Sequence, residues 1–219
     1  MNLSEPQKVY GLKIENTETY VADGILTHNS IYGFKGGNVD YFLNLIKSPN
    51  WKTYYLKNNY RCGSKIINLG TKVIKQADDI INTETVCMSK NKGNIKIDSR
   101  FRIDNYLTNL FQNSNYKDWF ILVRTNKDIV KLEDKLKRFQ IPYVTFKKSE
   151  VSLNEMQEIL KQNKVKLLTI HASKGLESPN VLLWGNFPIV QKPYLRNNDE
   201  IKILYVGITR AIDNLIILN

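Results

Sequence analysis

The apolar positions beyond residue 30 alternate between helical spacing and short continuous runs. Two predicted helices each carry four apolar residues on one face, namely Ile66, Ile67, Val73 and Ile74 in the first and Ile129, Leu132, Leu136 and Phe139 in the second. The apolar runs 120–123, 165–170, 181–184 and 215–218 predict four strands. Continuous runs of this kind are typical of strands buried on both faces of a mostly parallel sheet, so we expect an α/β fold with helices flanking the sheet.

The composition of the 219 residues is that of a folded protein, with 42% hydrophobic and 24% charged residues. This length suits one large domain, or one domain with an appendage. No run reaches the roughly 18–20 apolar residues that a membrane helix needs, and no secretory leader opens the chain, so we expect a cytoplasmic protein without a membrane partner. Cys62 and Cys87 form no C-x-x-C pair, which argues against a disulfide framework or a cysteine zinc site.

The net charge of +11 is unevenly distributed along the chain. Residues 1–29 hold two lysines and four acidic residues, so this segment carries −2 and the remaining 190 residues carry +13. Either a solvated lysine-rich surface or a site for polyanions produces such an excess, and composition does not decide between them. The change in sequence character near residue 30 predicts a functional boundary there.

Three segments concentrate polar side chains next to apolar runs, at 58–61, 168–177 and 204–211. Ligands of open α/β sheets bind beyond the carboxyl ends of the strands, so we expect the chemistry of this chain at that edge. The third segment is apolar and helix-like except for Arg210 and its neighbouring threonine.

Arg210 and Arg61 are the candidate anion ligands of these segments. A guanidinium on an apolar segment needs an anionic partner, and a phosphate suits its planar shape. A structural carboxylate such as Glu200 is the alternative partner. The sequence contains no G-x-x-x-x-G-K-[ST] phosphate loop, so we do not expect the chain by itself to cradle a nucleotide.

Five strings of residues, in this order and spacing, resemble motifs III, IV, IVa, V and VI of the UvrD/Rep-type superfamily 1 helicases. They are Ser30-Ile-Tyr-Gly-Phe-Lys-Gly-Gly37, Asn59-Tyr-Arg61, Val123-Arg124, Thr169-Ile-His-Ala-Ser-Lys-Gly-Leu-Glu177 and Tyr205-Val-Gly-Ile-Thr-Arg-Ala211. The resemblance implies an ATP-driven DNA translocase whose second RecA-like domain is residues 30–219. It also implies a compact domain, because the interval from Tyr143 to Thr169 is too short for the large subdomain that many relatives insert there.

The same resemblance implies roles for individual residues at an ATP site. Tyr60 would stack on the adenine, and Arg61 and Arg210 would reach the γ-phosphate as arginine fingers that neutralise charge during phosphoryl transfer. Glu177 would lie near the ribose and the metal. The Walker A lysine and the Walker B acids are missing from the sequence, so we expect a partner polypeptide to supply them and to hold most of the Mg²⁺ ligands.

By the same likeness, single-stranded DNA is the expected second ligand. Tyr32 and Phe34 match positions that stack on bases, which an aromatic ring does without sequence preference. The remaining candidates would bind DNA or support its groove, and they are Lys35, Arg124, Thr169 and His171. Ordinary core aromatics and a hydrogen-bonded loop histidine are the alternatives for Tyr32, Phe34 and His171.

Residues 1–29 resemble the carboxyl-terminal blocks of an intein, and they end in Gly-Ile-Leu-Thr-His-Asn before a serine. The resemblance implies that Asn29 cyclises onto its own carbonyl, that Ser30 is the hydroxyl nucleophile, and that His28 hydrogen-bonds the scissile carbonyl. A polar turn or helix cap after a hairpin is the alternative.

We therefore expect two parts, a split-intein fragment at 1–29 and a helicase carboxyl-terminal domain at 30–219. The chain starts at Met1 without an amino-terminal intein half, so splicing is expected in trans with an amino-terminal helicase half. The expected location is the cytoplasm of a prokaryotic cell or of a phage-infected host. The rival hypotheses are a non-splicing DNA-binding or regulatory fragment that associates non-covalently with that half, and a non-motor interaction protein with a helicase-like fold.

Overall fold

The computed structural model describes residues 57–78, 85–111, 115–146, 150–187, 189 and 197–219, together with residue 44 and four short strands near the amino terminus. These strands form two antiparallel pairs, β1 (Lys13–Ile14) with β2 (Thr17–Glu18) and β3 (Val21–Ala22) with β4 (Ile25–Leu26). The division at residues 29 and 30 remains a prediction, because the residues on both sides of it lie outside the described part.

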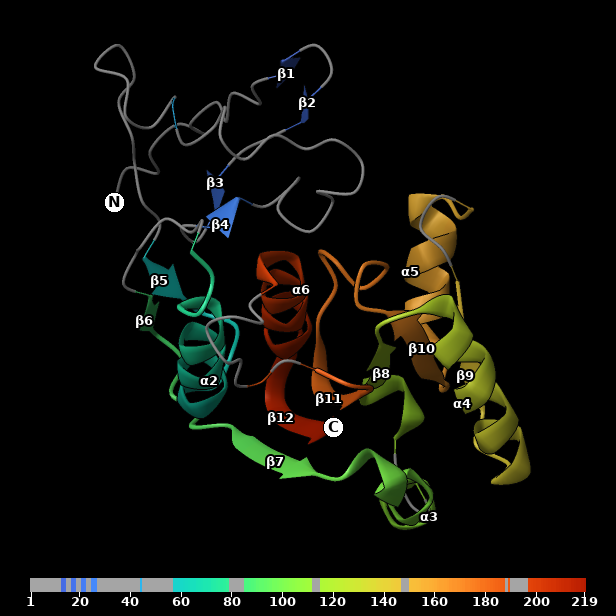
Figure 1. The fold of residues 1–219 in the computed structure, drawn as a ribbon. Coiled ribbons are helices and arrows are strands. Elements are labelled where there is room, and N and C mark those ends of the chain that lie inside the picture. The colour runs from blue at the N-terminus through green and yellow to red at the C-terminus, as the bar shows by residue number, and fades with distance from the viewer. Residues whose placement is uncertain are drawn as a thin grey trace, which may run out of the picture.

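A six-stranded parallel sheet forms the centre of the fold, in the order β7-β12-β11-β8-β10-β9 (Figure 1). Its strands are β7 (Asn94–Asp98), β8 (Trp119–Val123), β9 (Tyr143–Val144), β10 (Val165–Thr169), β11 (Ser178–Trp184) and β12 (Ala211–Leu218). Each of the four predicted apolar runs coincides with one of these strands, with run 165–170 extending one residue beyond β10, and all five residues of β8 are buried. The predicted α/β fold with a helix-flanked parallel sheet is confirmed.

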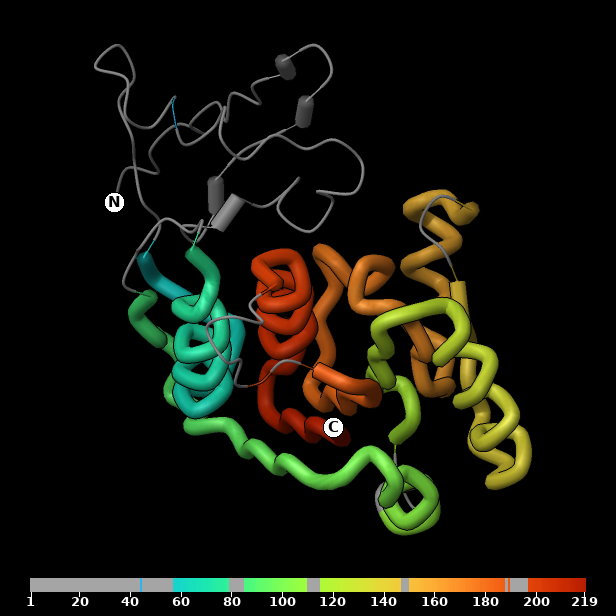
Figure 2. The backbone as a smooth tube through the Cα atoms, in the orientation of Figure 1, coloured from blue at the N-terminus to red at the C-terminus, as the bar shows by residue number. Residues whose placement is uncertain are grey.

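Helices cover both faces of the sheet. On one face α2 (Ser64–Ile74) and α6 (Asn198–Ile208) lie side by side (Figure 2) and share a core with Phe120 and Leu122. On the other face α3 (Ile103–Phe111) and α4 (Asn126–Arg138) pack against Ile121 and Val123. Successive side chains of a strand point to opposite faces, so β8 contributes to both cores.

Smaller elements complete the described part. α5 (Leu153–Lys161) lies between β9 and β10, and the short strands β5 (Asn58–Asn59) and β6 (Val86–Cys87) form a separate parallel pair. α6 ends at Ile208, so Arg210 lies in the turn before β12 and not on the helix that the apolar pattern predicted.

Lys166 is a charged side chain inside this sheet. It is fully buried in β10, and its Nζ donates to the carbonyl oxygens of Gln162 at 2.8 Å and Lys117 at 3.1 Å. Burial lowers the pKa of the Lys166 ammonium to about 8 from the usual 10.5, because it disfavours the charged form.

The lowered pKa predicts a pH dependence of stability. Between pH 8 and 10.5 the unfolded chain binds more protons at Lys166 than the folded chain, so this residue's contribution to stability rises with pH in that window. In urea titrations from pH 8 to 10.5, the free energy of unfolding of wild type should increase by roughly 1–3 kcal/mol relative to that of Lys166→Met. Lys131→Met, at a largely exposed position of α4, is the control, and its free energy of unfolding should change with pH in the same way as that of wild type. If the free energy of unfolding of Lys166→Met also followed that of wild type across this pH range, the prediction would be contradicted.

Candidate functional site

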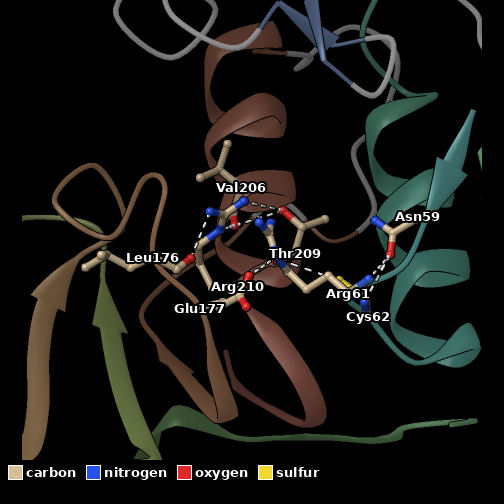
Figure 3. A network of polar contacts seen from close by, with 8 residues as sticks. All are labelled: Asn59, Arg61, Cys62, Leu176, Glu177, Val206, Thr209 and Arg210. Carbon is tan, nitrogen blue, oxygen red and sulfur yellow. Dashed lines mark hydrogen bonds and ion pairs between the residues drawn. The ribbon is translucent and has the colours of Figure 1, made fainter. Parts of the chain in front are cut away.

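Two arginines from distant parts of the sequence meet on one side of the sheet (Figure 3). Arg61 lies in the turn between β5 and α2, and Arg210 lies in the turn between α6 and β12. Glu177, which directly precedes β11, lies beside them and contacts Arg61. The structure thus brings together three of the four residues predicted for the ATP site, and the fourth, Tyr60, is the exposed neighbour of Arg61.

The turn that carries Arg61 is held by the buried side chain of Asn59. Its Oδ1 accepts hydrogen bonds from the backbone N–H groups of Arg61 at 3.1 Å and Cys62 at 3.0 Å. The backbone N–H of Gly63 then donates to the carbonyl of Ile212 in β12 at 2.9 Å. Sequence reasoning did not identify Asn59 as a positioning residue, although an asparagine two residues before a functional arginine is a recognisable turn signal.

Arg210 is only 9% exposed, and the acceptors that its side chain contacts among the described residues are all neutral oxygens. Nε donates to the carbonyl of Val206 at 3.0 Å, one terminal nitrogen to the carbonyl of Leu176 at 3.0 Å, and the other to the hydroxyl of Thr209 at 3.2 Å. No carboxylate among the described residues forms an ion pair with it. Burial, and then the charge of Arg61, lower the pKa of the Arg210 guanidinium to about 10.

Glu177 neutralises Arg61 but leaves Arg210 without a carboxylate partner in the described part of the chain. The Nε of Arg61 donates to Glu177, and both side chains are partly exposed, at 36% and 49%. Cys62 adds no negative charge, because burial raises the pKa of its thiol to about 11. The site therefore has a net positive charge in a partly desolvated place, which is the electrostatic condition for binding an anion.

Glu200, the alternative partner considered for these arginines, pairs instead with Arg124. The guanidinium of Arg124 donates through Nε to both carboxylate oxygens, at 3.0 and 2.9 Å, and through a terminal nitrogen at 2.6 Å. Hydrogen bonding to Glu200 raises the pKa of Arg124 further. The structural-carboxylate alternative is wrong for Arg210 within the described residues, and for Arg61 it holds with Glu177.

The candidate residues occupy two opposite edges of the sheet. Glu177 and Arg210 precede Ser178 and Ala211, which are register partners at the amino ends of β11 and β12. Thr169 ends β10 beside Val123 of β8, so Thr169, His171 and Arg124 follow the carboxyl ends. The expectation that all the chemistry lies at the carboxyl edge is wrong for Glu177 and Arg210, because the segment 170–177 and helix α6 each run from that edge to the amino ends of β11 and β12.

The remaining predicted site residues lie outside the described part, and they are His28, Asn29, Ser30, Tyr32, Phe34 and Lys35. Within the described part, no three histidine, cysteine or acidic side chains are grouped to hold a metal ion. No helix among the described residues has the length and apolar character needed to cross a membrane.

Gly63 tests how tightly the Arg61 turn is packed. A Cβ at this position would lie 2.5 Å from the backbone nitrogen and 2.6 Å from the Cα of Gly93, and backbone atoms cannot move aside as a flexible side chain does. Gly63→Ala should therefore destabilise the chain by roughly 1–3 kcal/mol in urea unfolding. Gly70→Ala, inside α2, is the matched control: its Cβ would meet only side chains, the Tyr205 ring at 3.3 Å and Ile208 at 3.6 Å, and the substitution should be neutral or slightly stabilising. Equal effects of the two substitutions would count against a clamped turn.

Comparison with known proteins identifies the family. Residues 54–151 and 146–219 match the profile of the UvrD-like helicase C-terminal domain. The probable DNA helicase II homolog of Mycoplasma pneumoniae is 37% identical over 81 residues, which cover 31% of this chain and 11% of that protein. The ATP-dependent DNA helicase Rep of Buchnera aphidicola is 27% identical over 124 residues, which cover 52% of this chain and 18% of that protein.

The chain thus spans between about a tenth and a fifth of the length of these relatives. Among solved structures, the C-terminal domain of a possible DNA helicase from Lactobacillus plantarum superimposes with a TM-score of 0.49 at 14% identity, covering 73% of this chain and 86% of that one. The family profile matches well over half of the sequence, including all the described residues of the arginine site. The chain belongs to the family of UvrD-like helicase C-terminal domains.

Proposed function

We propose that the chain is the second motor domain of an ATP-dependent DNA helicase, and that Arg61 and Arg210 are its arginine fingers. The observation that carries this proposal is the Arg210 guanidinium, which is nearly buried beside a second arginine and surrounded by neutral oxygens. The relatives described as DNA helicases support the same activity for the whole protein.

Burying a guanidinium without a carboxylate is costly, and the nearby charge of Arg61 increases the cost. A phosphate that arrives from outside offsets both costs. Within the described part of the chain, the Arg210 side chain uses three of its five N–H groups in hydrogen bonds, which leaves two for phosphate oxygens. Its neutral acceptors hold the side chain in place without neutralising it, which is the preorganisation that stabilises charge developing in a transition state.

Arg61 and Glu177 extend the site toward the rest of a nucleotide. Without a nucleotide, Glu177 neutralises Arg61, so a bound γ-phosphate has to replace this carboxylate. The exchange would turn Glu177 to the ribose and Mg²⁺ side of the nucleotide. Tyr60, 72% exposed and next to Arg61, offers an aromatic face for the adenine.

The other half of the ATP site belongs to a different polypeptide in this proposal. The sequence has no phosphate loop, and the metal ligands would come mainly from that partner, with Mg²⁺ arriving together with ATP. ATP would bind between the two motor domains and draw them together, and hydrolysis would let them separate. Arg61 and Arg210 would respond to whether the bound nucleotide still carries its γ-phosphate.

Single-stranded DNA is the proposed second ligand, at the opposite edge of the sheet. Arg124, Thr169 and His171 follow the carboxyl ends of β8 and β10, and Tyr32, Phe34 and Lys35 complete the proposed groove from outside the described residues. Arg124 is held by Glu200, so its role would be to shape the groove and to share its charge with a nearby phosphate.

The phosphate site can be tested on this chain alone, with inorganic tripolyphosphate as the probe in titration calorimetry. Arg210→Gln, which keeps much of the side-chain volume, should weaken binding by about 10- to 100-fold, the usual worth of a hydrogen bond to a charged group. Glu177→Gln should tighten binding about two- to fivefold, because it removes the carboxylate that competes for Arg61.

The matched control for this experiment is Arg138→Gln. Arg138 is a partly exposed arginine that pairs with Asp104 far along the chain from the site. Its replacement removes the same charge and should leave tripolyphosphate binding unchanged. If Arg210→Gln behaved like Arg138→Gln in a variant whose unfolding matches wild type, the arginine-finger assignment would fail.

We also propose that residues 1–29 are the short half of a split intein. The sequence His28-Asn29-Ser30 supports this, because each of these three side chains has a chemical use in splicing. The side-chain amide nitrogen of Asn29 would attack its own carbonyl carbon, which forms a succinimide and breaks the bond to the Ser30 nitrogen. Before this cleavage, the Ser30 hydroxyl would displace the Cys or Ser nucleophile of the amino-terminal intein half from the upstream extein, which becomes an ester on Ser30 while that nucleophile leaves with the proton. After the cleavage, the freed Ser30 amine would attack the ester carbonyl, which forms the amide and returns the Ser30 hydroxyl.

Splicing is tested by intact mass spectrometry after mixing the chain with a Walker-motif polypeptide that ends in an amino-terminal intein half. Wild type should yield a product in which the helicase half of the partner is joined to Ser30 by a peptide bond. It should also release a peptide that ends in a succinimide. Asn29→Ala should stop release of the joined product, because alanine has no amide to cyclise. Unchanged masses for wild type, with a partner of proven splicing competence, would favour the non-covalent fragment instead.

A further inference from the structure

An exposed aromatic ring stands at the corner between β7 and α3. The corner is a short helical turn, η2 (Arg100–Arg102), preceded by Ser99, and we call residues 99–102 the Phe101 corner. Phe101 is 83% exposed, the highest value among the large hydrophobic side chains that the structure describes as exposed. None of the roles proposed above uses this residue.

The backbone of the Phe101 corner is tightly held, so the exposure of the ring does not come from a loose loop. The N–H of Arg100 donates to the carbonyl of Asn219 at 3.1 Å, and its carbonyl accepts from the indole of Trp184 at 3.1 Å. Ser99 caps the turn, with its hydroxyl accepting from the Phe101 N–H at 3.4 Å and its carbonyl from the Arg102 N–H at 3.0 Å. A ring presented to water on a fixed backbone is a preorganised contact surface.

Two arginines flank the ring. The guanidinium carbon of Arg100 lies 5.2 Å from the centre of the Phe101 ring, and the Arg102 side chain is 65% exposed. The carboxylate paired with Arg102 is that of Asp98, at 3.5 Å, and it already accepts hydrogen bonds from the Ser99 N–H and the Tyr106 hydroxyl. The corner therefore offers a flat apolar face next to two cations that are not fully neutralised.

The corner also lies on the edge of the sheet proposed for DNA. Five strands end in one row of register partners, namely Thr169, Val123, Trp184, Leu218 and Asp98. With about 4.8 Å between neighbouring strands, the two ends of this row are about 19 Å apart. Thr169 stands at one end, and Asp98, followed directly by the Phe101 corner, stands at the other.

We propose that the Phe101 corner is a second contact for single-stranded nucleic acid, where a base stacks on Phe101 and neighbouring phosphates bind Arg100 and Arg102. Stacking on an aromatic ring beside basic side chains is how proteins bind single strands without sequence preference. An acidic peptide would match the two charges but would leave the ring in water. The proposal rests on the proposed function, since it extends the same DNA path across the row of strand ends.

The test measures binding of the full chain to a fluorescent oligo-dT by anisotropy. Phe101→Ala should weaken binding by roughly 5- to 100-fold, the usual effect of removing one stacked base contact, and Phe101→Trp should restore it. Removing an exposed ring should not prevent folding, and Leu153→Ala, which removes a 74% exposed side chain from α5, is the matched control. An oligonucleotide containing 5-iodouracil should cross-link to the peptide that carries Phe101.

Several results would overturn the proposal. If wild type bound oligo-dT and Phe101→Ala bound it equally well, the corner would have no part in binding, while the proposed function would stand. If wild type bound no oligo-dT but bound tripolyphosphate through Arg210, both the corner and the DNA path would be wrong and the nucleotide site would remain. If polyglutamate bound in a Phe101-dependent way and oligo-dT did not, the corner would be a protein-docking site instead.

Discussion

The arginine site depends on one constraint, the way in which a nearly buried guanidinium is held by neutral oxygens. Arg210 takes its acceptors from Val206 in α6, from Leu176 before β11 and from the adjoining Thr209. Two separate segments, the end of α6 with its turn and the segment before β11, therefore have to be in place before this charge is oriented. Because none of these acceptors neutralises it, the charge remains available to an incoming anion, and Arg61 beside it adds a second charge that Glu177 balances.

The parallel sheet determines where each group of candidate residues lies. Pairing of Ser178 with Ala211 places Glu177 and Arg210 side by side at the amino ends of two strands. The opposite ends of the strands carry Thr169 and Arg124. α6 connects the two edges, since Glu200 in its first turn holds Arg124 and Val206 in its last turn holds Arg210. Because α6 is a single helix that contacts both arginines, it is a physical connection through which a displacement at one edge of the sheet would be transmitted to the other.

Much of the fold could be predicted from the sequence, because burial leaves a direct record in residue type. The strands β8, β10, β11 and β12 each contain one of the predicted apolar runs, and the helices show their buried faces in the spacing of Ile66 and Leu132 with their neighbours. The residue at which helix α6 ends was harder to predict. The segment 204–211 is helix-like as a sequence, so its composition could not show that α6 ends at Ile208 and that Thr209 and Arg210 form a turn.

The sequence by itself determined the fold class, the family and the identity of the candidate side chains, since apolar periodicity and motif spacing are local properties of the chain. Only the tertiary structure decided which charges are paired. It gave Glu200 to Arg124 and Glu177 to Arg61, and it left Arg210 with neutral partners among the described residues. These pairings join residues far apart in the chain, so they follow from strand order and register. The same reason applies to the Phe101 corner, whose place beside the row of strand ends is visible only in the assembled sheet.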